Sequence, residues 1–176
     1  ELASAKEPAI SVHAWLVLNK VGSRAREDSL PANHVLNKHP EWVMRQTDGN
    51  KYFDDGTTIW IDPALPAVQR YQSELVREIA SRYPGIDGIH LDYIRYPDVD
   101  TGYSEPVLTQ YKLETGLNEK PSPRDNTFSN WRREKITQQV EMIYWTIQET
   151  NPRLLLSVAA SCNYKLPDGN PAQRSL

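Results

Sequence analysis

The chain has 176 residues, of which 39% are hydrophobic and 24% are charged, and this composition is typical of one ordinary globular domain. Its formal net charge is −3 and it has no basic run, so nothing favours nucleic acid or an anionic membrane as a partner. The single cysteine, Cys162, excludes an internal disulfide, and no apolar run is long enough to span a bilayer. We therefore expect no nucleic-acid partner and no membrane span.

Residues 10–18 predict a strand and residues 63–83 predict a helix. Along the first segment the two faces alternate: one carries Val12, Ala14, Leu16 and Leu18, and the other carries His13, Trp15, Val17 and Asn19. In the second segment apolar residues recur with a helical period, at Val68, Tyr71, Leu75, Ile79 and Tyr83. Asp62 is placed to cap this helix, because a carboxylate accepts from the free N–H groups of a first turn.

The rest of the chain repeats this alternation of strand and helix. Residues 86–92 predict a second strand, residues 131–150 a second long helix, and residues 154–161 a third strand. The apolar stripe of the long helix consists of Ile136, Val140, Ile143 and Ile147. A short helix is expected at residues 106–115, ending at Gly116.

The lengths of the connections indicate where a binding site lies. Both helix-to-strand links are short, at residues 84–85 and 151–153, whereas both strand-to-helix links are long, at residues 19–62 and 93–130. Long links therefore follow the carboxyl ends of the strands, which is where barrels and open parallel sheets bind their ligands. We expect the functional residues on that side.

The second strand is the most informative segment, because it brings a carboxylate to its carboxyl end. Successive side chains of a strand point to opposite faces, so Ile89 and Leu91 share one face while His90 and Asp92 share the other. This pattern suits a parallel strand that packs under helices on one side and borders a pocket on the other. The alternative is that Asp92 only caps the following turn or pairs with Arg95.

Several blocks of the sequence resemble the bacterial glycosyl-hydrolase-like family 10. They are VHAW at 12–15, HVLNKHPEW at 34–42, IDP at 61–63, DGIHLDYIRYP at 87–97, WRRE at 131–134 and LSV at 156–158. The resemblance implies a (β/α)₈ barrel that acts on glycosidic bonds, in bacterial proteins that are commonly exported and in some cases act on peptidoglycan strands. More distantly the chain resembles alpha-amylase-like barrels, in which the nucleophilic aspartate ends the fourth strand, at the place of Asp92.

The expected fold class is α/β, a (β/α)₈ TIM barrel of which this chain holds about three βα units. Such barrels typically have about 250 residues, so we expect residues 1–176 to be part of one glycoside-hydrolase-like catalytic domain. Three parallel strands cannot close a barrel, and their outer strands would have unpaired edges. Either further chain covers these edges or the protein associates with itself through them.

Glycoside hydrolysis requires two carboxyl groups across the sugar ring, and the sequence supplies one of them convincingly. We predict Asp92 as nucleophile or base, with Arg95 or His90 keeping it ionised and oriented. The third strand carries no acidic residue at its end, where Ser157, Ser161 and Asn163 stand, so the second carboxyl comes from a loop or from outside the segment. Acidic loop residues, each more often a solvated charge, are Asp54, Asp55, Asp98, Asp100 and Glu105.

Aromatic and polar residues on the strand ends and long loops are candidates for sugar binding, because flat rings stack on pyranose faces. The predicted substrate-binding residues are His13, Trp15, Asn19, Trp60, Tyr93 and Tyr96. Two long loops with aromatic residues favour a polysaccharide or oligosaccharide substrate over a small glycoside. Whether the reaction retains or inverts the anomeric configuration stays open.

Two alternatives to a glycosidase remain. His13, His90 and Asp92 share a face, and two histidines with one carboxylate are able to hold zinc or iron in a metal-dependent barrel hydrolase. The strands nevertheless lack a His-x-His pair, and we predict neither a metal nor another cofactor. The absent second carboxyl also leaves open a carbohydrate-binding domain without catalysis.

Overall fold

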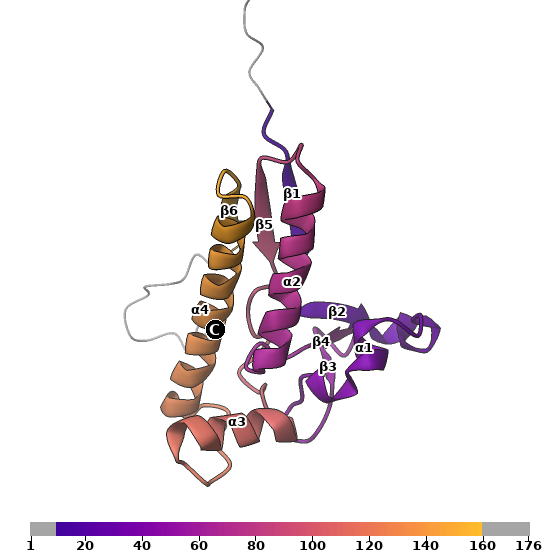
Figure 1. Cartoon of the computed structure of the whole chain (residues 1–176). Helices are drawn as coiled ribbons and strands as arrows, with labels where there is room; N and C mark the ends of the chain where they lie inside the picture. Colours follow the sequence, from indigo (N-terminus) through magenta and orange to yellow (C-terminus); the bar gives the residue numbers. More distant parts are fainter. Residues whose placement is uncertain (1–9, 160–176) are drawn as a thin grey trace, which may run out of the picture.

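The computed structural model describes residues 10–159, and they form an α/β fold (Figure 1). Three parallel strands make one sheet in the order β1-β5-β6, with β1 at His13–Val17, β5 at Gly88–Asp92 and β6 at Leu155–Val158. The helices α2, Pro66–Arg82, and α4, Asn126–Thr150, connect these strands and lie on one face of the sheet. The predicted βαβαβ order and the α/β class are confirmed. The described residues do not form a complete barrel.

The link between β1 and α2, predicted as a loop, contains a second, antiparallel sheet. Its strands have the order β2-β4-β3, with β2 at Lys20–Ser23, β3 at Tyr52–Phe53 and β4 at Thr58–Trp60. Between β2 and β3 lie the 3₁₀ helix η1, Arg24–Ser29, the helix α1, Val35–Lys38, and the 3₁₀ helix η2, Pro40–Trp42. Figure 1 shows this sheet beside the carboxyl ends of β1 and β5.

The second strand-to-helix link carries α3, Glu105–Thr115, which ends at Gly116 as predicted. Gly116 has φ of 73°, in the left-handed region that glycine enters without steric cost. In Figure 1 α3 lies near the first turn of α4, on the same side of the molecule as the carboxyl ends of the strands. Both long links therefore build structure on the side where we expect function.

The core between the parallel sheet and its two helices contains the outward residues of the strands. Ile89 and Leu91 are fully buried and belong to one apolar cluster with Val76 of α2 and with Ile143 and Ile147 of α4. Burying each such side chain contributes about 1.5–3 kcal/mol relative to leaving it exposed. The predicted stripe of α4 is confirmed, because Ile136 and Val140 also pack against this cluster.

The predicted stripe of α2 is largely wrong. Tyr71, Leu75 and Tyr83 are 42%, 38% and 59% exposed, and the helix buries a different face instead. The buried residues of α2 are Val68, Gln69, Gln72, Ser73, Val76 and Ala80. The helix also begins at Pro66, three residues later than predicted, because Asp62 binds the N–H of Ala64 in a turn before it.

Three buried carboxamides explain why α2 presents polar residues to the interior. Gln72 donates to the carbonyl of Leu18 and to Asn19 Oδ1, at 3.0 and 3.1 Å. Gln139 of α4 donates to the same Asn19 oxygen at 2.8 Å and also to Gln72. Because these amides satisfy one another, their burial carries little of the usual penalty, and they join α2, α4 and the end of β1.

No helix covers the other face of the parallel sheet within residues 10–159, and apolar side chains lie exposed there. Trp15, Val17 and Leu155 are 68%, 45% and 61% exposed. Strands β1 and β6 are also the two edges of this sheet. We refer to the face opposite α2 and α4 as the inner face. Among the described residues, no helix has the length and apolar character needed to cross a membrane.

Candidate functional site

The inner face brings together four of the predicted site residues. Parallel pairing places Trp15 of β1 opposite His90 of β5, and Val17 opposite Asp92. His90 in turn is opposite Ser157 of β6. Since paired residues of a parallel sheet point to the same side, His13, Trp15, His90 and Asp92 all lie on the inner face. The predicted phase of β1 and β5 is confirmed.

Gly88 permits the close approach of His13 to the beginning of β5. A Cβ atom at Gly88 would lie 2.6 Å from Cε1 of His13 and 2.7 Å from the carbonyl oxygen of Leu155. Real Cβ atoms do not come so close to other atoms, so only glycine leaves room for the imidazole. Because Gly88 has no side chain, the His13 ring is able to pack against the first residue of β5 on the inner face.

Asp92 is half-buried at the carboxyl end of β5, and two N–H donors hold its carboxylate. The indole Nε1 of Trp15 donates to Oδ2 at 3.2 Å, and the backbone N–H of Tyr93 donates to Oδ1 at 2.7 Å. The backbone carbonyl of Asp92 accepts from the N–H of Leu18, which ties the strand end to β1. Both carboxylate oxygens therefore have a set orientation.

Tyr93, the residue after Asp92, has a left-handed backbone with φ of 52°. For a bulky residue this conformation is unfavourable, and such residues often occur at functional sites. Two cations lie over its ring: Lys20 Nζ is 4.6 Å and Arg95 Cζ is 4.8 Å from the ring centre. The ring of Trp60 lies 5.5 Å away, nearly edge-on. Tyr93 is thus the centre of a mixed aromatic and cationic cluster.

Neither residue that we expected to orient Asp92 contacts it in the structure. Arg95 forms no ion pair with Asp92 within residues 10–159, and its guanidinium faces aromatic rings instead. His90 Nδ1 lies 2.9 Å from Ser157 Oγ. Trp15, expected only to bind substrate, is the side chain that orients the carboxylate. The alternative of an Asp92–Arg95 pair is likewise not seen.

Three predicted substrate-binding residues have no exposed surface. Asn19, Trp60 and Tyr96 are each 0% exposed. Asn19 belongs to the carboxamide cluster, the indole of Trp60 donates to Thr58 Oγ1, and the hydroxyl of Tyr96 donates to Asp62. Further chain packed against this segment would not expose these three side chains. Of the predicted substrate-binding residues, His13, Trp15 and Tyr93 retain accessible surface.

The sequence interpretation missed a buried cluster of Asp62, Tyr96 and Arg132 behind the site. Asp62 accepts from the N–H of Ala64 and from the Tyr96 hydroxyl, and its Oδ2 has no partner among the described residues. Burial raises the pKa of Asp62 to about 6, although these two hydrogen bonds and the Arg132 charge act to lower it. From the sequence Asp62 was predicted as a helix cap in preference to a binding residue, but it lies four residues before Pro66, where α2 begins.

Arg132 of α4 connects the loop after β5 to this cluster. Its guanidinium donates to the carbonyl oxygens of Val99, Thr101 and Pro123, at 2.8, 2.9 and 3.3 Å. The side chain is fully buried, and the Cζ atom lies 5.5 Å from the ring centre of Tyr96. The only signal in the sequence was an arginine on the helix face that also carries Phe128 and Lys135.

No second carboxylate faces Asp92 from the three described strands. Three of the five acidic loop residues that we considered have local partners: Asp54 accepts from Thr58, Asp98 from Val99, and Asp100 from Thr47. At the opposite end of β5, Asp87 accepts from the backbone N–H of Val12 at 2.8 Å, a structural role. Within residues 10–159 no three histidine, cysteine or acidic side chains lie close enough together to hold a metal ion. His13, His90 and Asp92, which we considered as such a set, therefore do not form a metal site.

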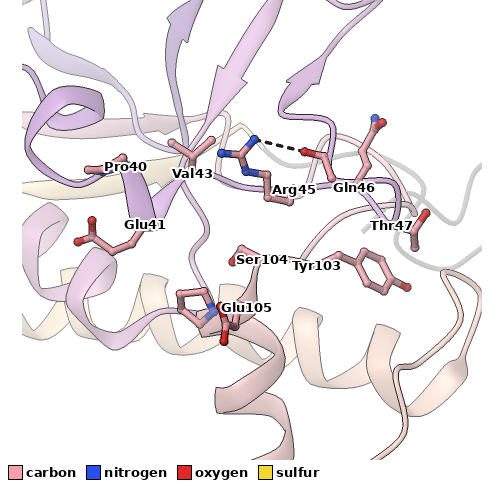
Figure 2. Close-up of a pocket in the computed structure, with 11 residues that line it drawn as sticks. Pro40, Glu41, Val43, Arg45, Gln46, Thr47, Tyr103, Ser104 and Glu105 are labelled. Carbon is pink, nitrogen blue, oxygen red and sulfur yellow. Dashed lines mark hydrogen bonds between the residues drawn. The ribbon is translucent and has the colours of Figure 1, made fainter.

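A hollow of about 330 Å³ lies apart from the inner face, at the first turn of α3 (Figure 2). Its lining comes from η2 and the segment after it, and from the residues just before and at the start of α3; it includes Glu41, Arg45, Tyr103, Ser104 and Glu105. Arg45 spans this segment by donating to the carbonyl of Gly49 at 3.2 Å. Of the acidic loop residues considered from the sequence, only Glu105 lines this hollow.

Among the proteins similar to this chain are two curated glycosyl hydrolases and the solved structure of a fucosidase. Glycosyl hydrolase YngK of Bacillus subtilis (strain 168) is 25% identical over 154 residues, which are 85% of this chain and 26% of that protein. Glycosyl hydrolase DigH of Escherichia coli (strain K12) is 24% identical over 168 residues, which are 90% of this chain and 34% of that protein. The chain thus spans about a quarter to a third of these relatives.

The solved structure is alpha-L-fucosidase isoenzyme 2 from Paenibacillus thiaminolyticus, with a TM-score of 0.59 at 18% identity. The match covers 86% of this chain and 20% of that enzyme, and at this identity it shows a shared fold alone. The family model described as glycosyl hydrolase-like 10 matches residues 2–170, nearly the whole chain. The chain therefore belongs to the glycosyl hydrolase-like 10 family.

Proposed function

We propose that the full-length protein is a glycoside hydrolase in which the inner face forms part of the wall of a closed (β/α)₈ barrel. The observation that carries the proposal is the carboxylate of Asp92, which ends a parallel strand on the inner face and is held by Trp15 and the Tyr93 amide. Active sites of such barrels lie at the carboxyl ends of the strands. Membership of the glycosyl hydrolase-like 10 family supports this reaction class.

In this proposal Asp92 acts on the anomeric carbon, as nucleophile, or on the attacking water, as base. Either role requires an ionised carboxylate in a fixed position, and the two N–H donors hold its oxygens in place. The protonated partner carboxyl comes from chain outside residues 10–159, at about 5–5.5 Å for retention or 6.5–9.5 Å for inversion. The exposed ring of Trp15 supplies a flat surface beside the reacting sugar.

The missing strands of the barrel would also cover the exposed apolar surface. Val17 and Leu155 belong to the two edge strands, and both side chains are exposed. In a closed barrel such inward residues are packed in layers against strands from the rest of the wall. Covering by the protein's own chain therefore explains this exposure without requiring self-association.

As substrate we propose a polysaccharide, with bacterial cell-wall glycan as the first candidate and export from the cytoplasm as its consequence. Support comes from the resemblance of the sequence to its family and from the two long links at the carboxyl ends of the strands. One link builds a second sheet and the other carries α3, so both extend the surface beyond a pocket for one sugar.

A second candidate function is glycan binding without hydrolysis. It is favoured by one observation: Asp92 is the only carboxylate that the described strands β1, β5 and β6 place on the inner face. A lone carboxylate binds sugar hydroxyls but does not complete the acid and base pair of a glycosidase.

A glycan panel assayed with the full-length protein separates the two functions. The panel includes purified cell-wall glycan strands, neutral plant-type polysaccharides and short aryl glycosides, and products are identified by mass. Hydrolysis of at least one polysaccharide supports the enzyme. Retention on a glycan column without new reducing ends favours the binding protein, and cleavage of aryl glycosides alone overturns the proposed substrate class.

A further inference from the structure

Arg95 is held in place, yet its guanidinium has no polar partner among residues 10–159. The carbonyl of Arg95 accepts from Asn19 at 3.4 Å, which anchors the backbone in the carboxamide cluster. Its Cζ lies 4.8 Å from the ring centre of Tyr93 and 5.9 Å from that of Trp60. Within the described segment no carboxylate, carbonyl or hydroxyl accepts a hydrogen bond from its N–H groups.

A second cation, Lys20, lies over the same Tyr93 ring at 4.6 Å. Its nearest carboxylate oxygen is Asp54 Oδ2 at 4.0 Å, the outer limit of an ion pair, and that oxygen already accepts from Thr58 at 2.8 Å. Both members of this pair are exposed enough for water to weaken their attraction, with side chains 30% and 39% exposed. Lys20 is therefore only weakly neutralised by the protein.

Asp92 and Asp98, the two carboxylates nearest to Arg95 in sequence, form no ion pair with it among the described residues either, and Asp98 accepts from the N–H of Val99. Asp92 binds Trp15 Nε1 with one oxygen and the Tyr93 N–H with the other. Two positive charges thus stand beside one aromatic ring, next to the proposed catalytic group, with little compensation from the described residues. A guanidinium fixed over rings is pre-organised, because little side-chain entropy remains to be lost when it binds an acceptor.

We propose that Arg95, assisted by Lys20, forms a subsite for an acidic group of the glycan. The planar guanidinium offers parallel N–H donors that match the two oxygens of a carboxylate. This inference rests on the proposed function, since it names the class of glycan that the same site accepts: a saccharide with a negatively charged substituent. A neutral glycan lacks that contact and binds more weakly.

The test compares glycans that differ only in charge. Two probes have one backbone: N-acetylglucosamine oligosaccharides, and the same oligosaccharides with C6 hydroxyls oxidised to carboxylates. A second pair is prepared in the same way from maltooligosaccharides. Binding is measured by calorimetric titration with full-length protein carrying Asp92→Asn, so that hydrolysis does not consume the ligand. The expected result is tighter binding of the oxidised member of at least one pair, and the advantage shrinks at high salt.

Substitution then assigns the effect to residues. Arg95→Gln should weaken binding of the oxidised probe about 10-fold or more and change binding of the neutral probe less than about 2-fold, and Arg95→Lys should lie between. Lys20→Gln should have a smaller effect of the same sign. The matched control is Arg24→Gln, because Arg24 lies over the ring of Tyr52 at 4.8 Å, away from Tyr93, and should change neither.

Two results would overturn the subsite. One is that, for both backbones, the charged and neutral probes bind with equal affinity or neither probe binds. The other is an equal loss for both probes in Arg95→Gln, which would make Arg95 a packing residue. The proposed hydrolysis fails by a different observation, namely absence of turnover by the protein with Asp92 intact, and selective binding of the oxidised probe survives that result.

Discussion

The indole N–H of Trp15 donates to Oδ2 of Asp92 across 3.2 Å, from one strand of the sheet to the next. Trp15 is 68% exposed, so burial does not fix its ring, and this hydrogen bond is the contact that orients it toward Asp92. The relationship assigns Trp15 two roles in the proposed site: it sets the carboxylate of Asp92 and presents a flat surface to sugar.

Trp15→Phe keeps an aromatic ring and removes the donor. We expect kcat of the full-length protein to fall about 10-fold, because a hydrogen bond to a charged group contributes about 1.5–3 kcal/mol. Stability should change little, since the side chain is exposed. Trp145→Phe is the control, because Trp145 is 62% exposed on α4 and far in the sequence from the site. Unchanged kcat in Trp15→Phe would remove Trp15 from the mechanism.

Asp62→Asn should stabilise the protein at neutral pH and not at acidic pH. Burial raises the pKa of Asp62 to about 6 from 3.8, so the folded state binds the proton more tightly than the unfolded state. Stability therefore falls as the pH rises from about 4 to about 6. Near pH 4.5 the native carboxyl is largely protonated, and the variant should have a similar melting temperature.

Above pH 7 the variant avoids a buried charge whose cost is on the order of 1–3 kcal/mol. The charged and titratable groups that face Asp62 are Arg132 and Tyr96, both unchanged in the variant. Melting temperatures of the two full-length proteins between pH 4.5 and pH 8 check this expectation. A difference that does not depend on pH, or that grows toward acid, contradicts it.

Arg132→Leu should lower the free energy of unfolding by about 3 kcal/mol or more, because it leaves buried carbonyl groups without a donor. The affected carbonyls belong to Val99, Thr101 and Pro123, so the loop before α3 should also become more sensitive to protease. Arg133→Leu is the neighbouring control, since Arg133 is exposed. Urea denaturation and limited proteolysis measure both effects, and equal behaviour of the two variants would contradict the assigned role.

Gly88→Ala should destabilise the parallel sheet by about 1–3 kcal/mol, because the new methyl group meets both the His13 ring and a backbone oxygen. The histidine is able to turn away, but the carbonyl of Leu155 belongs to the neighbouring strand. Gly85→Ala is the matched control, as a Cβ there would meet nothing within 4 Å. Chemical denaturation of both variants provides the comparison, and a harmless Gly88→Ala would show that β5 and β6 adjust freely.

The sequence predicted the strands of the parallel sheet well because alternation of side chains is a local signal. Ile89 and Leu91 are buried and His90 and Asp92 are not, as their phase indicated. The same reasoning failed for α2, where Gln69 and Gln72 occupy the buried face. A hydropathy pattern cannot identify a glutamine whose amide is satisfied by residues more than fifty positions away.

The second sheet and the partners of Asp92 could not be predicted for a related reason. Strands β3 and β4 have two and three residues, too few for a period to be recognised. The expected partner Arg95 was chosen for its charge and its nearness in sequence, whereas the observed partner Trp15 lies 77 residues away. Contacts between distant segments depend on the register of the strands, which single-segment patterns do not specify.

If Asp92 performs the chemistry of a glycosidase, turnover depends on its carboxylate and not on the carboxylate of Asp87. Turnover of purified cell-wall glycan strands is measured for full-length protein carrying Asp92→Asn or Asp87→Asn, with thermal unfolding measured alongside. Asp87 is the control because it lies at the opposite end of the same strand, where, among residues 10–159, its carboxylate accepts only from the N–H of Val12.

We predict that Asp92→Asn reduces turnover about 1000-fold or more while the melting temperature stays close to that of the parent, because the change removes charge and keeps shape. Asp87→Asn should instead cost about 1 kcal/mol of stability and leave the turnover of the folded protein intact. Equal turnover in Asp92→Asn and the parent would contradict the claim and would leave Asp92 as a residue of the turn after β5.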